Sequence, residues 1–187
     1  MNRAETALIT SPPRRWLQRA YEVPVLLRFG GRLSPGSKAL EIGCGSGYGS
    51  QLVLQRFGAQ RIDALDLDPA MIERARVRLG PYGERVNLVC GSATDLRSAL
   101  NAEDRSYDAV FDFGIIHHIP DWRAAVAEAA RVLTPGGRCF DRGCQRRQRG
   151  IRSQRVLTAK PPVTLAHEPS TSAELRRYVW QPVDRRG

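Results

Sequence analysis

The chain has 187 residues and 42% hydrophobic content, which suits one globular domain with its own core. Its formal net charge of +10 is uneven, because residues 1–138 carry 18 Lys+Arg against 15 Asp+Glu whereas residues 139–187 carry 11 against 4. No apolar run approaches the roughly eighteen residues of a membrane span, and the first residues lack the layout of a signal peptide, so we expect a cytoplasmic protein.

The first predicted element is a helix within residues 14–30. Trp16 and Tyr21 stand at helical spacing with other apolar residues, and Pro24 is expected to break or kink the segment. We expect residues 1–36 to form a helical lead-in that lies over the domain. An aromatic pair on such a helix is typical of core packing, and covering a ligand pocket is the alternative for Trp16 and Tyr21.

Between residues 37 and 140, strand-like apolar runs alternate with helix-like segments. Strands are expected at 38–44, 61–66, 86–90 and 107–113, and helices at 48–57, 69–79, 95–100 and 121–133. Pro69 suits the first turn of a helix and Asp121 suits a helix cap. This alternation predicts an α/β fold, a Rossmann-like, doubly wound and mostly parallel sheet with helices on both faces.

The regularity ends after Gly137, where a strand expected at 138–140 runs into the Arg-rich stretch DRGCQRRQRG. We interpret residues 141–187 as a basic, irregular tail in which the C-terminal strands are atypical or missing. Weak strand signals occur at 155–159 and 162–167, and a last helix is expected at 172–179. The basic residues are nearly all arginine, a bias that codon composition can produce. Contact of this tail with RNA or anionic lipid is therefore a minor alternative, and no DNA contact is expected.

The stretch LEIGCGSGYGS, residues 40–50, places a glycine-rich turn between the first strand and the next helix. In a doubly wound sheet this turn lies beneath the ligand. A dinucleotide loop needs a small residue at the third place of G-x-G-x-x-G/A, but Tyr48 or Ser50 stands there, and no lysine follows as a phosphate loop requires. A nicotinamide-dependent enzyme is therefore disfavoured.

The observed spacing is G-x-G-x-G, formed by Gly43, Gly45 and Gly47, with Glu41 two residues before it. A carboxylate at that place suits a ligand that carries a sulfonium or ammonium charge, and it repels a pyrophosphate. The alternative for the three glycines is a plain tight turn.

At this loop the chain resembles the class I S-adenosylmethionine-dependent methyltransferases, whose first motif is an acid, an apolar residue and GxGxG, as in EIGCGSG. The resemblance extends over about residues 40–140 and includes ALDLDPAMIERAR, VCGSATDL and FDFGIIHHIPDWRAAVAEAARVLTPGG in the family's order. It implies S-adenosyl-L-methionine as the cofactor and methyl transfer as the activity. The scattered cysteines Cys44, Cys90, Cys139 and Cys144 have no zinc-ligand spacing, so no metal is expected.

The resemblance also implies which residues line the cofactor. Asp66 ends the second strand, where the family's acid accepts hydrogen bonds from both ribose hydroxyls, and Leu67 would then lie against the adenine; a helix-capping acid is the alternative for Asp66. The family usually carries Gly-Asp where this chain has Gly91-Ser92, and Ser92 can accept the same bond without charge. The predicted cofactor site consists of Glu41, Gly43, Gly45, Gly47, Asp66, Leu67 and Ser92.

Two candidate catalytic residues, His117 and His118, follow the fourth strand, at the end where an acceptor would meet the methyl group. Methyl transfer is an in-line displacement, so a general base is needed only when the nucleophile carries a proton. Histidine titrates near neutrality and can accept that proton. Packing under the loop or plain exposure to solvent is the alternative for each.

The same stretch narrows the substrate class. Adenine-amino methyltransferases carry Asp/Asn-Pro-Pro-aromatic after the fourth strand and cytosine-C5 enzymes carry Pro-Cys, whereas this chain reads DFGIIHH. The similarity is to the small-molecule branch, which includes enzymes that methylate quinones, lipids and secondary metabolites. A non-catalytic cofactor-binding or RNA-associated protein is the alternative function.

The resemblance ends at Cys139, where the family continues with a fifth strand, a helix and an antiparallel hairpin. Three interpretations are open for residues 139–187: a basic binding tail, a divergent folded terminus, or a frameshift near Arg138, which the abrupt change of composition favours. Loss of the last strands predicts unpaired strand edges and, as an alternative for function, an inactive, truncated methyltransferase.

Overall fold

The structure, a computed structural model, describes residues 16–141, 155–159 and 180–182. Its strands are β1 Lys38–Ile42, β2 Arg61–Asp66, β3 Val86–Cys90, β4 Tyr107–Asp112, β5 Leu133–Asp141, β6 Arg155–Ala159 and β7 Trp180–Pro182. Its α-helices are α3 Val23–Gly30, α4 Tyr48–Leu52, α5 Pro69–Leu79, α6 Leu96–Leu100 and α7 Trp122–Val132. Short helical turns are η1 Gln18–Glu22, η2 Val53–Phe57, η3 Gly80–Arg85 and η4 Ile116–His118. None of the helices in these ranges combines the length and apolar character needed to span a membrane.

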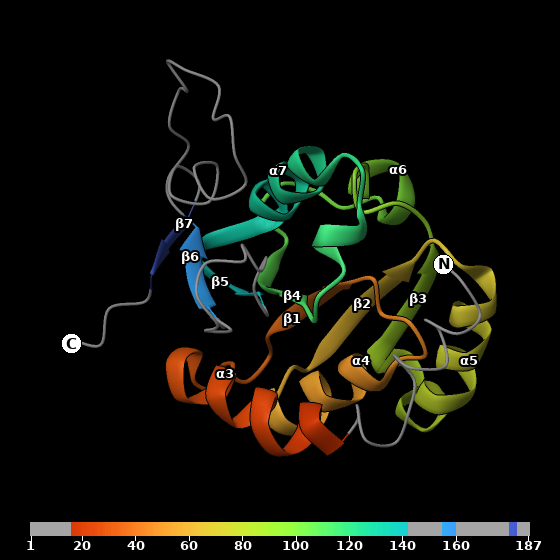
Figure 1. Ribbon diagram of the computed structural model, residues 1–187, viewed down its shortest axis with the longest axis horizontal. Coiled ribbons are helices and arrows are strands. Elements are labelled where there is room, and N and C mark those ends of the chain that lie inside the picture. The colour runs from red at the N-terminus through yellow and green to blue at the C-terminus, as the bar shows by residue number, and fades with distance from the viewer. Residues whose placement is uncertain (1–15, 142–154, 160–179, 183–187) are drawn as a thin grey trace.

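All seven strands form one sheet in the order β3-β2-β1-β4-β5-β6-β7. The first five pair in parallel, and β6 and β7 are antiparallel to their neighbours. Helices α3, α4 and α5 cover one face of the sheet, and α6 and α7 cover the other (Figure 1). The predicted doubly wound, mostly parallel α/β fold is therefore confirmed.

The local sequence explains where these elements begin. Strands β1 and β4 are buried along almost their whole length, as their near-continuous apolar sequences require of parallel strands covered on both faces. Three helices begin with an aspartate whose side chain accepts a backbone N–H bond: Asp68 from Ala70 at 2.9 Å, Asp95 from Ser98 and Asp121 from Ala124, both at 3.0 Å. The predicted roles of Pro69 and Asp121 are borne out.

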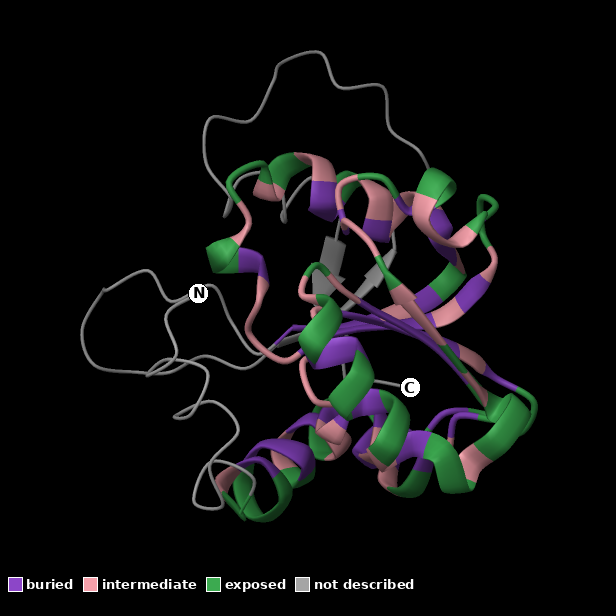
Figure 2. Cartoon of the chain, turned by 90° about the vertical axis from the view of Figure 1, so that its right-hand side faces the viewer, coloured by how far each residue is buried: buried purple, intermediate pink, exposed green. Residues whose placement is uncertain are grey.

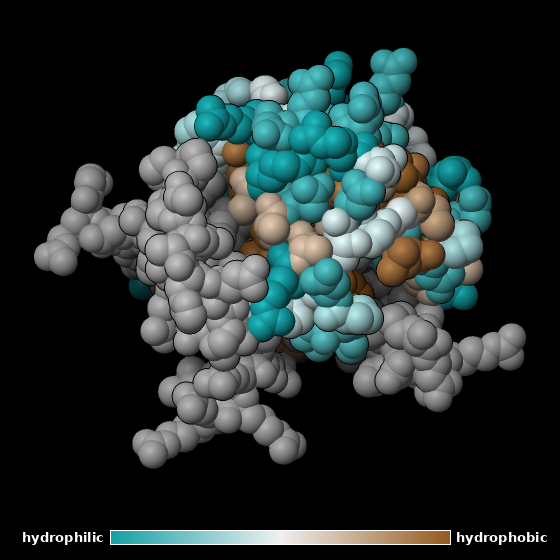
Figure 3. Space-filling view, turned by 90° about the horizontal axis from the view of Figure 1, so that it is seen from above, coloured by the Kyte–Doolittle hydropathy of each residue, from teal (hydrophilic) through white to brown (hydrophobic). Residues whose placement is uncertain are grey.

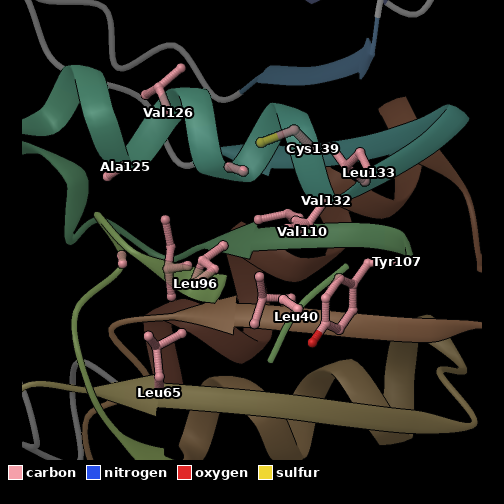
Figure 4. Packing of buried hydrophobic residues seen from close by; sticks show 14 of the residues in the cluster. Leu40, Leu65, Leu96, Tyr107, Val110, Ala125, Val126, Val132, Leu133 and Cys139 are labelled. Carbon is pink, nitrogen blue, oxygen red and sulfur yellow. The ribbon is translucent and has the colours of Figure 1, made fainter. Parts of the chain in front are cut away.

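The core lies in two layers, one on each side of the sheet (Figure 2). On the α6–α7 side, side chains of β1, β2 and β4 point toward α7, and Leu40, Val110 and Val132 are among the buried residues that meet there (Figure 4). On the other side, Phe111 stacks on Phe140 with ring centroids 4.4 Å apart. The outer surface above α6 and α7 is largely hydrophilic (Figure 3). Both helices are therefore amphipathic, with an apolar side on the sheet and a polar side toward solvent.

The N-terminal helix differs from its prediction in two respects. Trp16 and Tyr21 are exposed, so the prediction that they pack in the core is wrong. Pro24 does not break the helix, because it lies in the first turn of α3 directly after the π-helical turn η1. The N–H of Val23 bonds to the carbonyl of Gln18, five residues earlier, as in a π-helix. This π-helical turn ends directly before Pro24, which has no N–H to donate.

The C-terminal part of the sheet also differs from expectation. The chain leaves α7 at Val132, so Leu133 belongs to β5 and not to the helix, and the β4–β5 register shifts between Tyr107 and Ala109 to accommodate the Pro-Gly-Gly turn. The edge of β5 is paired by β6, so the expectation of an unpaired edge there is wrong, whereas the strand signal at 155–159 is confirmed. The signals at 162–167 and 172–179 lie outside the described residues.

Two buried carboxyl groups lie side by side at the carboxyl ends of β4 and β5. Asp112 and Asp141 are register partners, and both are almost fully buried. Asp112 Oδ1 accepts N–H bonds from Gly114 and Ile115 at 2.8 and 2.6 Å. Burial, followed by the charge and the hydrogen-bonded carboxyl of Asp141, raises the pKa of Asp112 to about 7.

This raised pKa predicts a pH-dependent stability. The folded protein keeps a proton on Asp112 that the unfolded chain releases near its ordinary value of 3.8. The contribution of Asp112 to the free energy of unfolding should therefore be largest at low pH. It should fall as pH rises from about 4 to about 7, by up to ~1.4 kcal/mol per pH unit. Urea unfolding at pH 5 and pH 8 measures the difference.

Asp112→Asn isolates this contribution, because the amide can still accept from the loop and can donate to Asp141. We expect it to reduce the loss of stability between pH 5 and 8 and to stabilise the protein at pH 8 by roughly 2 kcal/mol. The matched control is Asp104→Asn, since Asp104 is exposed and an ion pair with Arg131 holds its pKa below the ordinary value. A slope that Asp112→Asn leaves unchanged would contradict the assignment.

Candidate active site

The candidate site lies where the strand order reverses, at the carboxyl ends of β1 and β4. Three loops meet at this edge: the glycine loop after β1, the turn after β2 and the segment after β4. Because parallel strands share one carboxyl edge, residues that are far apart in the sequence come together here. All the residues predicted from the sequence lie at or directly after the ends of β1, β2, β3 and β4.

The glycine loop depends on its glycines for two different reasons. Gly43, Gly45 and Gly47 all have positive φ, at 66°, 53° and 80°, which L side chains rarely adopt. A Cβ atom on Gly43 would lie 2.5 Å from the side chain of Ile115, and one on Gly47 would lie 2.9 Å from Leu79. A Cβ on Gly45 would meet no atom within 4 Å. Gly43 and Gly47 thus allow close packing, whereas Gly45 faces open space.

Asp66 fixes this loop to the end of β2. Its Oδ2 accepts the N–H of Gly45 at 2.8 Å, and its Oδ1 accepts the N–H of Asp68 at 2.9 Å. A carboxylate offers about four acceptor positions, so both oxygens retain capacity for a further hydroxyl group. The side chain is only partly buried, so a ligand can reach it.

Glu41 lies under the first turn of α4 and is almost fully buried. It accepts a hydrogen bond from the hydroxyl of Ser50, and a Cβ on Gly49 would collide with its carboxyl group. Burial is the main reason why its pKa is raised to about 8, with smaller contributions from Asp66 and Asp112. Glu41 is therefore protonated at neutral pH unless a positive charge lies beside it.

Leu67 directly follows β2, and Ser92 follows β3, the neighbouring strand. Leu67 is 69% exposed. The N–H of Gly91 bonds to the carbonyl of Asp66 at 3.0 Å, which joins the two strand ends. The hydroxyl of Ser92 lies 2.7 Å from that of Thr94 and accepts the N–H of Thr94 at 3.2 Å. An exposed apolar side chain and a hydroxyl group thus border one open edge.

The segment after β4 carries the two histidines. Both are exposed in η4, and their ring centroids are 3.9 Å apart. The N–H of His118 bonds to the carbonyl of Ile115 at 2.8 Å, and the two loop bonds to Asp112 hold Ile115 against Gly43. Within the described residues, His, Cys, Asp and Glu side chains form no group of three that could hold a metal ion.

Four residues that support the site were not found from the sequence. Ile115 packs against Gly43, Ser50 bonds to Glu41, Asp112 holds the loop after β4, and Arg78 Nε donates to the carbonyl of Ser46 at 2.8 Å. Asp112 carried a usable signal, since it ends an apolar strand just as Asp66 does. The others meet their partners across loops or helices and have no local pattern.

Comparisons with known proteins agree with this geometry. A family model for the methyltransferase domain matches residues 39–137. The ubiquinone biosynthesis O-methyltransferase of Xanthomonas axonopodis pv. citri is 35% identical over 119 residues, which are 63% of this chain and 48% of that protein. A Mycolicibacterium smegmatis protein named as a probable S-adenosylmethionine-dependent methyltransferase is 37% identical over 102 residues, 54% of this chain and 36% of that protein. The chain thus spans about half the length, or less, of these curated relatives.

Solved structures show the same likeness. Phosphoethanolamine N-methyltransferase 2 of Haemonchus contortus, solved with S-adenosyl-L-methionine, is 29% identical with a TM-score of 0.57 over 65% of this chain and 27% of that one. The YcgJ protein of Bacillus subtilis is 28% identical with a TM-score of 0.54 over 65% of this chain and 49% of that one. The family model covers more than half of the chain, and the fold and motif order agree with it. The chain therefore belongs to the methyltransferase-domain family, among the class I S-adenosylmethionine-dependent methyltransferases.

Proposed function

We propose that this protein transfers a methyl group from S-adenosyl-L-methionine to a small-molecule acceptor. The observation that carries the proposal is the bond between the Gly45 N–H and Asp66, beside a position where a Cβ would meet no atom. This arrangement leaves an open cradle lined by a carboxylate with spare acceptor positions. Ribose hydroxyl groups are the natural donors for such a carboxylate.

The backbone of the loop argues against a dinucleotide. A pyrophosphate needs free N–H groups at the start of the helix, but the N–H of Cys44 bonds to Leu65, that of Gly47 bonds to Cys44, and that of Gly45 bonds to Asp66. Three N–H groups of the loop, which a phosphate could otherwise use, are thus already bonded within the protein. The nearby carboxylate of Asp66 would in addition repel it.

The proposed roles follow the geometry. Asp66 would accept the ribose hydroxyls, Leu67 would lie against the adenine, and Ser92 would bond to its edge. The cofactor supplies a methyl group on a sulfonium centre, and its positive charge would favour the ionised form of Glu41 beneath the loop. The chain itself contributes alignment, which can remove roughly 7 to 11 kcal/mol of barrier from a displacement of this kind.

We place the acceptor over the segment after β4 and infer that it carries a hydroxyl group. Relatives named as O-methyltransferases of ubiquinone biosynthesis support this class of acceptor. A hydroxyl nucleophile must lose its proton, and His117 and His118 lie in the segment where a base would be needed. We infer a cytoplasmic location from the cysteines, whose scattered positions do not indicate a disulfide framework.

Titration calorimetry tests the cofactor, with S-adenosylhomocysteine as the ligand and NADH as the control. We expect binding of the former alone, and Asp66→Ala should weaken it roughly 100-fold, because two hydrogen bonds to a charged acceptor and the anchoring of the loop are lost together. Binding of NADH, or full affinity in Asp66→Ala, would contradict the proposal.

Gly45→Ala tests the cradle itself. The added methyl group would point into the space proposed for the ligand, so we expect affinity for S-adenosylhomocysteine to fall at least about 10-fold. Gly36→Ala is the matched control, since Gly36 also has a positive φ, 86°, and no atom within 4 Å of its Cβ position, but it lies before β1. Both variants should lose a similar stability, about 1–2 kcal/mol, and only the first should lose affinity.

His117→Ala and His118→Ala test the base. With a phenolic acceptor, the variant that lacks the base should lose about 10²–10⁴-fold in kcat while its affinity for S-adenosylhomocysteine stays unchanged. Added imidazole should restore part of the rate. If both variants keep kcat within about twofold, which is far below the effect of a base, neither histidine accepts the proton.

A further inference from the structure

The outer side of the N-terminal helical segment, residues 16–30, has an unusual composition. Its exposed residues are Trp16, Arg19, Ala20, Tyr21, Pro24, Arg28 and Phe29. Trp16 is 71% exposed, Tyr21 55% and Phe29 45%. The one acidic residue of the segment, Glu22, is buried. Three aromatic rings and two guanidinium groups therefore face outward together with no exposed carboxylate among them.

The orientation of this segment is fixed from the inside. Gln18, Glu22, Val23, Leu26 and Gly30 are buried and form one stripe that packs toward the sheet. At its end, the carbonyl of Gly30 accepts a bond from the guanidinium of Arg138. The aromatic side cannot turn inward without exposing this stripe. We define the outward side by its five functional side chains, Trp16, Arg19, Tyr21, Arg28 and Phe29, and call it the aromatic-arginine face.

The arginines of this face have no carboxylate partner among the described residues. Neither Arg19 nor Arg28 forms an ion pair with a residue that the structure describes, as also holds for the exposed Arg61 and Arg74, whereas Arg76, Arg97 and Arg131 are paired with carboxylates. On α5, for example, the exposed Val77 lies beside a helix surface where Glu73 offsets Arg76. The aromatic-arginine face thus combines uncompensated positive charge with large amphipathic rings.

We propose that the aromatic-arginine face docks the protein on the surface of an anionic lipid bilayer. Tryptophan and tyrosine prefer the boundary between water and lipid, and arginine keeps its charge at the headgroups while its stem contacts apolar surface. A helix of this composition lies in the plane of the interface. Residues 1–138 carry a net charge of +3, so the electrostatic attraction at this face rests on Arg19 and Arg28 themselves.

The spacing favours a bilayer over a protein groove or RNA. A helix that fills a groove presents anchors three, four and seven residues apart, whereas the aromatic residues here are Trp16, Tyr21 and Phe29, spread along the whole segment. RNA bases stack on aromatic residues of a flat sheet or a groove, and this face is a convex helix. A lipid surface, unlike a groove, needs no fixed spacing of its anchors.

Sedimentation of the full chain with vesicles tests this docking without relying on methyl transfer. We expect the protein to pellet with vesicles of equal phosphatidylglycerol and phosphatidylcholine and to stay in solution with phosphatidylcholine alone. Trp16→Ala with Tyr21→Ala should lower partitioning at least about 10-fold, and Arg19→Gln with Arg28→Gln should lower it about 5-fold for each arginine. All four side chains are exposed, and circular dichroism verifies that the variants fold.

Arg61→Gln with Arg74→Gln is the matched control. It removes the same charge from exposed positions on β2 and α5, away from the aromatic-arginine face, and should change partitioning less than about 3-fold. Equal losses in the two arginine pairs, or an aromatic variant that binds like the wild type, would show that net charge alone is responsible and overturn the proposal. Binding to single-stranded RNA, sensitive to the aromatic substitutions and without vesicle binding, would overturn it as well.

Discussion

The site depends above all on the carboxylate of Asp66, which accepts the N–H groups of Gly45 and Asp68 and so joins the loop after β1 to the end of β2. An acid at this place does two things at once. It accepts the N–H of Gly45, and it leaves oxygen acceptors free for neutral hydroxyl groups. One side chain therefore selects the ligand class by exclusion as well as by attraction, because an anion meets repulsion where a ribose meets acceptors.

Much of the sheet could be predicted because parallel buried strands have a strong local signature. The runs that became β2, β3 and β4 are apolar, short and bounded by polar residues, and their predicted bounds agree closely with the structure. The errors came where tertiary context overrides local pattern. Trp16 and Tyr21 have helical spacing, but spacing alone does not say which side of a helix faces the sheet; the stripe from Gln18 to Gly30 does. The pairing of β6 with β5 was likewise invisible, since an antiparallel partner can come from any distance along the chain.

The candidate site could also be predicted in part from the sequence. The glycines and Asp66 could be placed because the strand–turn–helix pattern fixes their position relative to the sheet, and the structure brings them together. What the sequence did not reveal is that Glu41 is buried and that burial raises its pKa, because its environment is created by Ser50, Gly49 and α4 in three dimensions. Because burial raises the pKa of an acid, Glu41 is not a fixed negative charge, and its ionisation depends on the charge of the ligand that binds above it.

The order of the strands has a consequence for how the protein forms. β1 lies between β2 and β4, and the hydrogen bond at the start of the β1–β4 pairing, from the backbone N–H of Lys38 to the side-chain carboxylate of Asp108, spans 70 residues. Gly43 receives its packing partner, Ile115, only when that distant segment has arrived. A nascent chain that has emerged only as far as β3 therefore carries the complete glycine motif without its packed loop. Binding competence is gained late in folding, when the longest chain closure at this edge has been made.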